Sequence, residues 1–326
     1  MVTYSKLVHK PKLFKTMTGF CHAEFDAFVI RLTPLWSTAE EERLFRTDRV
    51  RATGAGHPYH LATLEDKLLV VLMWYRLYCI YDLLGLVFDM DGSNICRLIR
   101  RMKSLIEAAA DPTLRDGLVS LQKNVKEIQK RKKITTWEEL IKHIPELEEV
   151  IIDSTEQPRK RPVNQKKQKN RYSGKKKRHT VKTQITITTT GKILDVSKSY
   201  PGRIHDKRIL EREKTLDKIP KKTKKRMDTG YDGTQKNHPD HCIILPHKRR
   251  RNSPLLTRGQ KNANTKRAKK RILVENVLSR VKKYQVIAQI YRSDERDYNQ
   301  DFRNVAALTN YRLAWRQQQT SVAGFA

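Results

Sequence analysis

The sequence predicts a chain of two parts, an all-α N-terminal region followed by an α/β domain with a mixed sheet. Apolar residues recur at helical spacing between residues 61 and 101, whereas short β-branched runs and turn signals appear only after residue 149. A length of 326 residues is enough for two domains. We therefore expect helices over 1–110, a helical linker over 111–148, the α/β domain over 149–316 and a flexible tail over 317–326.

The first strong helix signal follows Thr63, which can cap a helix whose first turn carries Glu65 and Asp66. A second, shorter helix is expected over 81–88, and "DMDG" interrupts it. Ser93 can then cap a third helix with an apolar inner face. Its outward residues are predicted to be Arg97, Arg100, Arg101 and Lys103. Two helices around a glycine-containing turn, the second one basic, form the outline of a helix-turn-helix, although many helical bundles contain such a turn.

The charge of the chain points to a polyanionic partner. There are 68 Lys and Arg against 35 Asp and Glu, a formal net charge of +33. Such an excess favours nucleic acid or an anionic membrane surface as partner. No run of 18 apolar residues is present and the N-terminus lacks the apolar core of a signal peptide, so nucleic acid is favoured and no membrane is expected. The four cysteines form no Cys-x-x-Cys pair, which argues against a zinc ribbon or a disulfide framework.

The α/β domain begins with "VIIDSTEQ", a short β-branched run at 150–157. Twelve Lys and Arg follow between Arg159 and Lys182, and no acid occurs between residues 157 and 194. A hairpin is expected around Thr190 and Gly191, then a helix, a strand leading to Asp228, a further strand, and a helix over 272–285. This order predicts a mixed sheet with helices on its faces.

Three carboxylates of this domain are candidates for one site. Asp153 is expected to end the first strand, Asp228 to end a later strand, and Glu275 to lie near the start of the last long helix. Considered alone, Glu275 is predicted to be a solvated helix charge paired with a neighbouring cation. Strand ends meet at one edge of a sheet, however, and clustered carboxylates are the ligands that Mg²⁺ prefers. Two such ions can act in a displacement at phosphorus, with Lys and Arg holding a DNA backbone.

Five blocks in order carry a resemblance to a known family. They are the region from "TGAGHPYHLATLEDK" to "GSNICRLI", "ELEEVIIDSTEQPRKRP", "NRYSGKKKRHTVKTQI" with "SYPGRIHDKRIL", "MDTGYDG", and "RILVENVLSRVKKYQVI". Over nearly the whole chain the sequence resembles DDE transposases of bacterial insertion sequences, in the branch related to Harbinger transposases. The resemblance implies a ribonuclease H-like catalytic domain with the triad Asp153, Asp228 and Glu275, and an N-terminal helix-turn-helix domain.

The family resemblance also implies an activity and partners. We expect two Mg²⁺ ions held by the triad, with Mn²⁺ as a substitute, and cleavage of DNA followed by strand transfer. The DNA partners would be the terminal inverted repeats of an element and its target. A homodimer or higher oligomer on DNA, in the cytoplasm with the nucleoid, would fit this activity. The alternatives are a catalytically inactive or domesticated DNA-binding protein, and a metal-dependent endonuclease without strand transfer.

Other residues have expected roles around this site. Asp206 in "PGRIHDKR" could be mistaken for the second acid, but it is expected to cap a helix, so Asp228 is favoured; His205 and Asp206 would support the ligands or face the DNA. Tyr172 could stack on a base. Arg280 and Lys282 follow Glu275 by one and two turns and are candidates for backbone contacts, the alternative being solvated charges. The full set of DNA-contact candidates is Ser93, Asn94, Arg97, Arg100, Arg101, Tyr172, Lys175, Lys176, Lys177, Arg178, His179, Arg280 and Lys282.

Overall fold

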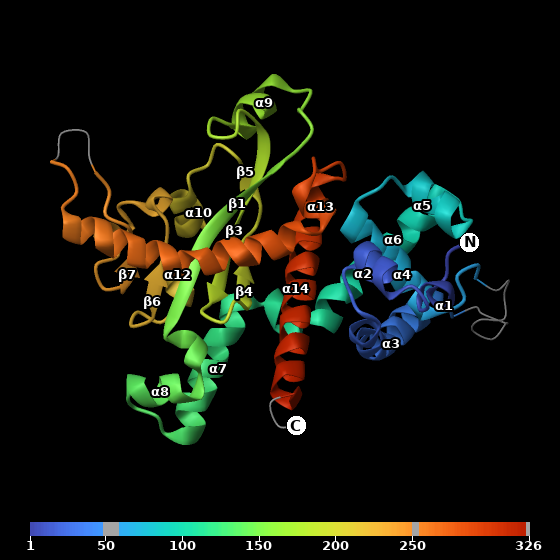
Figure 1. Cartoon of the computed structure of the whole chain (residues 1–326), viewed down its shortest axis with the longest axis horizontal. Helices are drawn as coiled ribbons and strands as arrows, with labels where there is room; N and C mark the ends of the chain where they lie inside the picture. Colours follow the sequence, from blue (N-terminus) through green and yellow to red (C-terminus); the bar gives the residue numbers. More distant parts are fainter. Residues whose placement is uncertain (48–58, 250–253, 324–326) are drawn as a thin grey trace. The chain divides into compact units, whose positions relative to one another are not determined.

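The computed structural model describes residues 1–47, 59–249 and 254–323 (Figure 1). The chain forms two compact units, and each is described by itself. The first comprises residues 1–115, 283–289 and 300–326, and the second comprises residues 116–282 and 290–299. The first part of the predicted helix-turn-helix block, residues 53–58, lies outside the described residues.

The first unit is helical. Thr63 caps its central helix as predicted, with its side chain accepting a hydrogen bond from the backbone N–H of Asp66. This helix is buried along most of its length because it packs against several others. The elements are α1 (Tyr4–Leu7), α2 (Pro11–Thr18), α3 (His22–Leu44), α4 (Leu64–Leu77), α5 (Tyr81–Phe88), α6 (Gly92–Ala110), η1 (Pro112–Arg115), α13 (Gln285–Ala288) and most of α14 (Glu295–Ala323).

Helices α5 and α6 pack together around a tight turn, as the helix-turn-helix outline predicts. The cap of α6 differs from the prediction. Asp91, not Ser93, is the N-cap residue, and its carboxylate accepts a hydrogen bond from the Ser93 N–H. Gly92 is needed at the start of α6, because a Cβ there would lie 2.1 Å from a carboxylate oxygen of Asp82.

Lys103 was predicted to point outward from α6, and this prediction is wrong. Its side chain is 3% exposed, and its ammonium lies 2.7 Å from Asp301 of α14, which is fully buried. The ammonium also lies 4.5 Å from the centre of the Trp74 ring. Tyr75 donates a hydrogen bond to the same carboxylate, and Asn304 donates one to the Tyr75 hydroxyl. A buried lysine needs such partners, and the spacing of apolar residues along the helix does not reveal them.

The second unit is an α/β structure. Its strands are β1 (Glu149–Pro158), β2 (Tyr172–Ser173), β3 (Arg178–Thr188), β4 (Ile193–Val196), β5 (Tyr200–Pro201), β6 (Lys224–Arg226) and β7 (Ile243–Ile244). Its helices are α7 (Gly117–Lys132), α8 (Trp137–His143), η2 (Pro145–Leu147), α9 (Gln165–Arg171), α10 (Asp206–Arg212), η3 (Leu216–Lys218), η4 (Thr229–Tyr231), α11 (Thr234–Asn237) and α12 (Arg258–Lys282). Residues 290–299 complete the unit.

The sheet is mixed and has the ribonuclease H-like order. Strand β3 lies between β1 and β4, and both pairs are antiparallel; β1, β6 and β7 then follow side by side in parallel. The predicted hairpin is confirmed: Gly191, with φ of +85°, forms its turn. A left-handed conformation there suits glycine. Nine residue pairs join β1 to β3, from Val150 with Thr188 to Pro158 with Thr180.

The two faces of the sheet bury different helices. Val150 and Ile152 of β1 pack with Leu118 of α7 and Leu210 of α10 on one face. Helix α12 contacts β1 and buries three valines, Val274, Val277 and Val281. Side chains alternate along a strand, so Ile151 and Asp153 point to the face opposite Val150 and Ile152. Figure 1 shows α12 running across the strands.

Two expectations about element positions differ from the structure. Asp153 lies in the middle of β1, which continues for five more residues to Pro158. Helix α12 begins at Arg258, so Glu275 lies in its last third and not near its start. Asp195 lies on β4, which pairs only with β3 among the described strands, and its carboxylate approaches Gly117 at the start of α7.

The linker and tail regions are also helical. Residues 111–148 contain η1, α7, α8 and η2, and α14 continues to Ala323, through most of the expected tail; residues 324–326 lie outside the described part. Among the described helices, none is both long enough and apolar enough to span a bilayer.

Candidate active site

Asp153 and Asp228 are brought together on the α12 face of the sheet. Strands β1 and β6 are parallel neighbours, and Asp228 follows β6 by two residues as the N-cap of η4. The Asp228 carboxylate accepts a hydrogen bond of 2.6 Å from the Thr229 N–H. The Asp153 carboxylate accepts one of 2.8 Å from the Ser154 N–H. Each carboxylate is thus oriented by the backbone of the residue that follows it.

A single guanidinium bridges the two carboxylates. Arg271 of α12 lies 3.0 Å from Asp228 and 3.8 Å from Asp153. The three side chains are 18%, 35% and 16% exposed, so the group opens to solvent mainly at Asp228. Arg271 is thus a cation held by two aspartates. Its position between them indicates that this pair of carboxylates suits a positive charge.

Burial dominates the electrostatics of Asp153. It raises the pKa of this carboxyl from 3.8 to about 6, while the Ser154 N–H and Arg271 oppose the rise. The nearby charges of Asp228 and Asp206 add to it. A carboxylate in this position gains from any further cation, because added positive charge favours its ionised form.

Asp206 belongs to a second charged group near the first. The buried Lys182 of β3 lies 3.0 Å from Asp206 and 3.3 Å from Glu156 of β1. Its ammonium also donates to the Ile204 carbonyl at 2.9 Å. Asp206 is the first residue of α10, and the exposed His205 is its N-cap residue, so Asp206 does not cap the helix as expected. Lys182 therefore binds Asp206, whereas Asp228 shares Arg271 with Asp153.

Gly230, between Asp228 and Tyr231, lets Asp206 come close. A Cβ at this position would lie 2.7 Å from a carboxylate oxygen of Asp206. The absence of a Cβ at Gly230 therefore leaves room for the Asp206 carboxylate beside Asp228.

A buried hydrogen-bond chain supports the strand that carries Asp153. The Tyr231 ring is fully buried, and its hydroxyl lies 2.9 Å from the Ser154 hydroxyl. Tyr231 donates to Gln184 of β3 at 3.2 Å, and Gln184 donates to Thr215 at 2.9 Å. These contacts join β1, β3 and the segment after Asp228 behind the carboxylates, so Tyr231 supports the strand that carries Asp153.

Glu275 does not contact either aspartate in this structure. It is exposed on α12, one helical turn after Arg271. Among residues 1–47, 59–249 and 254–323, no three acidic, histidine or cysteine side chains gather closely enough to hold a metal ion. The structure therefore brings together Asp153 and Asp228, with Arg271 in place of the third carboxylate.

One predicted DNA-contact residue of this unit, Lys282, interacts with the Asp153 carboxylate. Desolvation and the charge of Lys176 lower the pKa of Lys282, while Asp153 and Glu156 oppose the fall. Lys282 is thus close enough to Asp153 and to Lys176 to interact with both charges. Arg280 lies instead against the β3–β4 turn at Gly191. Tyr172 is 43% exposed, and the half-buried His179 packs edge to face against it at 5.7 Å. Of the remaining candidates here, Lys175, Lys177 and Arg178 are exposed.

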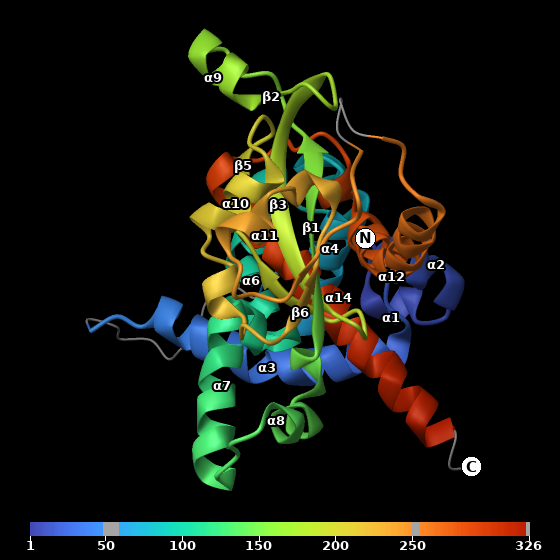
Figure 2. The ribbon, with the colours of Figure 1, turned by 90° about the vertical axis from the view of Figure 1, so that its left-hand side faces the viewer.

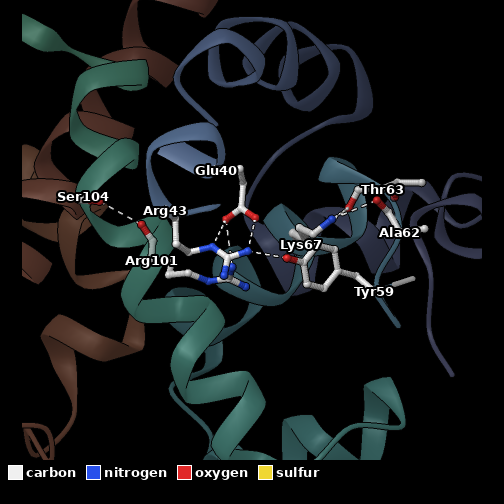
Figure 3. A network of polar contacts seen from close by, with 8 residues as sticks. All are labelled: Glu40, Arg43, Tyr59, Ala62, Thr63, Lys67, Arg101 and Ser104. Carbon is white, nitrogen blue, oxygen red and sulfur yellow. Dashed lines mark hydrogen bonds and ion pairs between the residues drawn. The ribbon is translucent and has the colours of Figure 1, made fainter. Parts of the chain in front are cut away.

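In the first unit, the exposed face of α6 carries Ser93, Asn94, Arg97 and Arg100. Arg101 differs, because its guanidinium binds Glu40 of α3 at 3.0 Å (Figure 3). Glu40 also binds Arg43 at 2.8 Å, and Figure 3 shows Lys67 donating to carbonyls close by. A cavity of about 640 Å³ adjoins this group and α6. Its wall includes five cations, Arg43, Lys67, Arg97, Arg100 and Arg101.

Comparison with known proteins agrees with this arrangement. Residues 152–310 match the family model of the DDE superfamily endonuclease, and residues 59–111 match the helix-turn-helix of DDE superfamily endonuclease. Two regions of the chain thus match the catalytic domain and the helix-turn-helix domain of this superfamily. It is 29% identical over 253 residues to a probable transposase for insertion sequence element IS702 from Microchaete diplosiphon, covering 77% of this chain and 81% of that protein. No solved structure matches the chain.

DDE endonucleases generally use divalent metal ions, and the donor set can be tested against that need. Asp153 and Asp228 offer hard carboxylate oxygens around a shared cation, which suits such an ion. Sequence reasoning missed two residues of this site, Arg271 and Lys182. The available signal for Arg271 was its spacing: it precedes Glu275 by four residues and so lies on the same helix face. Lys182 had no signal beyond a general excess of cations.

Proposed function

We propose that this chain is the DNA transposase of an insertion sequence, which cleaves DNA at the ends of its element and joins the freed strands to target DNA. The observation that carries the proposal is the Asp153 and Asp228 pair around Arg271 on the sheet of a DDE endonuclease. The similarity to a probable insertion-sequence transposase over most of both chains supports it.

Asp153 and Asp228 would hold Mg²⁺, with Glu275 as the third ligand and Mn²⁺ as a substitute; two ions are proposed. When bound, Mg²⁺ activates an attacking oxygen and stabilises the leaving oxygen in a displacement at phosphorus. Glu275 can serve only if α12 presents it to the aspartates, because Arg271 lies there in this structure.

The chain's own residues would prepare the site. The backbone N–H groups of Ser154 and Thr229 orient the two carboxylates. At neutral pH Asp153 is mostly ionised, since its pKa is about 6. Lys282 lies within electrostatic reach of Asp153 and would hold the phosphate backbone beside it, together with Lys176, whose charge acts on Lys282.

The helix-turn-helix would recognise the terminal inverted repeats. Ser93, Asn94, Arg97 and Arg100 form the exposed face of α6, as a recognition helix requires. Arg101 is held by Glu40 and would contribute after exchanging that partner for a phosphate. We further propose that a dimer or higher oligomer assembles on the DNA, and that the protein works at the nucleoid in the cytoplasm.

Cleavage and joining assays test the proposal. The substrate is the native gene with its flanking DNA, incubated with Mg²⁺ or Mn²⁺. The wild-type chain should cut at the ends of short inverted repeats, and Asp153→Asn, Asp228→Asn and Glu275→Gln should not. Wild-type cutting by Glu275→Gln would remove this residue from the site. If Asp206→Asn is inactive and Asp228→Asn is active, the second acid is Asp206.

An endonuclease without strand transfer would share the cutting step. Supplying DNA with a pre-cut 3′-hydroxyl end together with target DNA separates the two activities. Joined products support a transposase, and cutting without joining supports an endonuclease alone. Tight binding to the flanking DNA without either reaction would indicate an inactive DNA-binding protein.

A further inference from the structure

Residues 159–177 form a basic arm between the two longest strands of the sheet, β1 and β3. The arm contains α9 and β2, and ten Lys and Arg without a single Asp or Glu. Both views show α9 beyond the end of these strands (Figures 1 and 2). None of the α9 side chains is buried. The arm is therefore a projecting segment and contributes little to the core.

The base of the arm is fixed by one carboxylate. Glu295, in the segment that completes the second unit, binds Arg159 at 3.0 Å and also binds Arg171. The Tyr291 N–H donates to the Pro158 carbonyl at 2.9 Å, which ties this segment to the end of β1. Glu295 therefore binds two half-buried arginines, Arg159 before α9 and Arg171 at the last position of α9.

The arm is also ordered within itself. Gln168 of α9 donates to the Pro162 carbonyl at 2.8 Å and accepts from Arg161 at 3.0 Å. The Lys176 N–H donates to the Ser173 hydroxyl at 3.2 Å in the turn before β3. A self-folded arm presents its charges in fixed positions, which lowers the entropic cost of binding a partner.

The remaining cations of the arm are exposed and have no carboxylate partner among the described residues. They are Lys160, Arg161, Lys166, Lys167, Lys169, Lys175, Lys176 and Lys177. Val163 and Tyr172 lie among them, 98% and 43% exposed. Eight cations without a carboxylate partner, together with two apolar side chains, suit a polyanion with a groove. Duplex DNA is such a partner.

The length of β1 sets the distance between Asp153 and the start of the arm. Arg159 follows Asp153 by six residues of extended chain, which spans roughly 20 Å. Duplex DNA rises 3.4 Å per base pair, so this length corresponds to about six base pairs. We propose that the basic arm, through Lys166, Lys167 and Lys169 of α9, grips the backbone of the element-end duplex about six base pairs or more from the cleaved phosphate. This inference rests on the proposed function.

The test compares two charge-matched triple variants. One carries Lys166→Gln, Lys167→Gln and Lys169→Gln on α9; the control carries Lys123→Gln, Lys126→Gln and Lys130→Gln on the exposed face of α7. Binding to the end-labelled native gene with its flanking DNA is measured over a range of salt concentrations. The α9 variant should lower the slope of log affinity against log salt by about 2 to 3, since each phosphate contact contributes about 0.9.

Hydroxyl-radical footprinting on the same DNA gives the position of the contact. The α9 variant should lose protection about six base pairs or more from the cleavage position and keep it at the cleavage position itself. Equal loss of affinity in both triple variants would overturn the inference. Unchanged protection of the element-end DNA, combined with a defect only in joining to target DNA, would overturn it as well. A wild-type chain that neither binds nor cuts this DNA would overturn the proposed function, which is a different outcome.

Glu295→Gln separates the fixing of the arm from its charge. This variant frees Arg159 and Arg171 without removing any cation. DNA affinity should be kept or raised, while the protection attributed to the arm becomes diffuse. A sharp footprint at the wild-type position would show that Glu295 does not set the position of the arm.

Discussion

Each unit contains a cation that is bound by buried or half-buried carboxylates, and the two groups differ in how far they are closed to solvent. Lys103 and Asp301 in the first unit are 3% and 0% exposed and are surrounded by Tyr75, Trp74 and Asn304. Arg271 in the second unit is shared by two aspartates that remain partly open. Lys103 and Asp301, the sealed pair, can only stabilise the fold. Arg271 with Asp153 and Asp228, the open group, can exchange its cation.

The largest expected difference between the two groups is in catalysis. Asp228→Asn should lower DNA cleavage by at least about 10³-fold, or about 4 kcal/mol of barrier, because it removes a proposed metal ligand. Asp301→Asn is the matched control, since it changes an aspartate in the sealed pair. Cleavage per folded molecule should stay near wild type in the control. Comparable loss in both variants would remove the functional distinction between the groups.

The next largest effect concerns stability of the sealed pair. Lys103→Met leaves the Asp301 carboxylate buried without its cation, which should cost about 3 to 5 kcal/mol in the free energy of unfolding. The double variant Lys103→Met with Asp301→Leu should recover most of this loss, because no unpaired charge remains. Urea unfolding measures both. A single variant within about 0.5 kcal/mol of wild type would show that the pair is open to water.

The stability that Asp153 contributes to the open group should fall as pH rises. Burial raises the pKa of Asp153 from 3.8 to about 6, so the folded state favours the protonated carboxyl. This contribution is complete below pH 4 and is lost as pH rises through 6. In the absence of metal, Asp153→Asn should therefore be more stable than wild type above pH 6, by up to about 3 kcal/mol.

That gain should shrink to nothing as pH falls from 6 to 4, and thermal unfolding with a chelator present measures it. Adding Mn²⁺ should stabilise wild type and leave the variant unchanged. A gain that is constant over this pH range would contradict the assigned titration.

The smallest expected effect is at Tyr231. Tyr231→Phe removes the hydroxyl that joins Ser154 to Gln184 and should cost about 1 to 2 kcal/mol of stability. Tyr200→Phe, which loses a bond to Glu213 in a half-buried position, should cost less. Chemical denaturation compares the two. A larger loss of stability in Tyr200→Phe would show that the hydrogen bonds behind Asp153 add no more stability than a half-buried hydrogen bond elsewhere.

Much of the fold followed from the sequence because its signals are local. The Thr63 cap, the hairpin turn at Gly191 and the parallel strand before Asp228 each depend on a few neighbouring residues. The start of α12 did not follow, because residues 258–271 are mostly polar or basic, none of them is buried, and they carry no apolar stripe. The end of β1 was missed for a related reason: its last five residues, 154–158, are mostly polar, so their alternating burial is not visible as an apolar pattern in the sequence.

The candidate site was predictable as a set of acids but not as a set of contacts. Asp153 and Asp228 meet because parallel strands place them together. Arg271 lies where Glu275 was expected, and its spacing of one helical turn from Glu275 does not tell which of the two side chains faces the aspartates. That choice depends on how α12 packs, a property of the whole unit.

The basic arm also gives the protein a site for limited proteolysis. Trypsin cleaves after lysine and arginine, and α9 offers both in an exposed helix without a buried side chain. A cut there would leave two fragments still joined by the nine residue pairs of β1 and β3. The nicked protein should therefore migrate as one species until it is denatured, and bound DNA should slow the nicking.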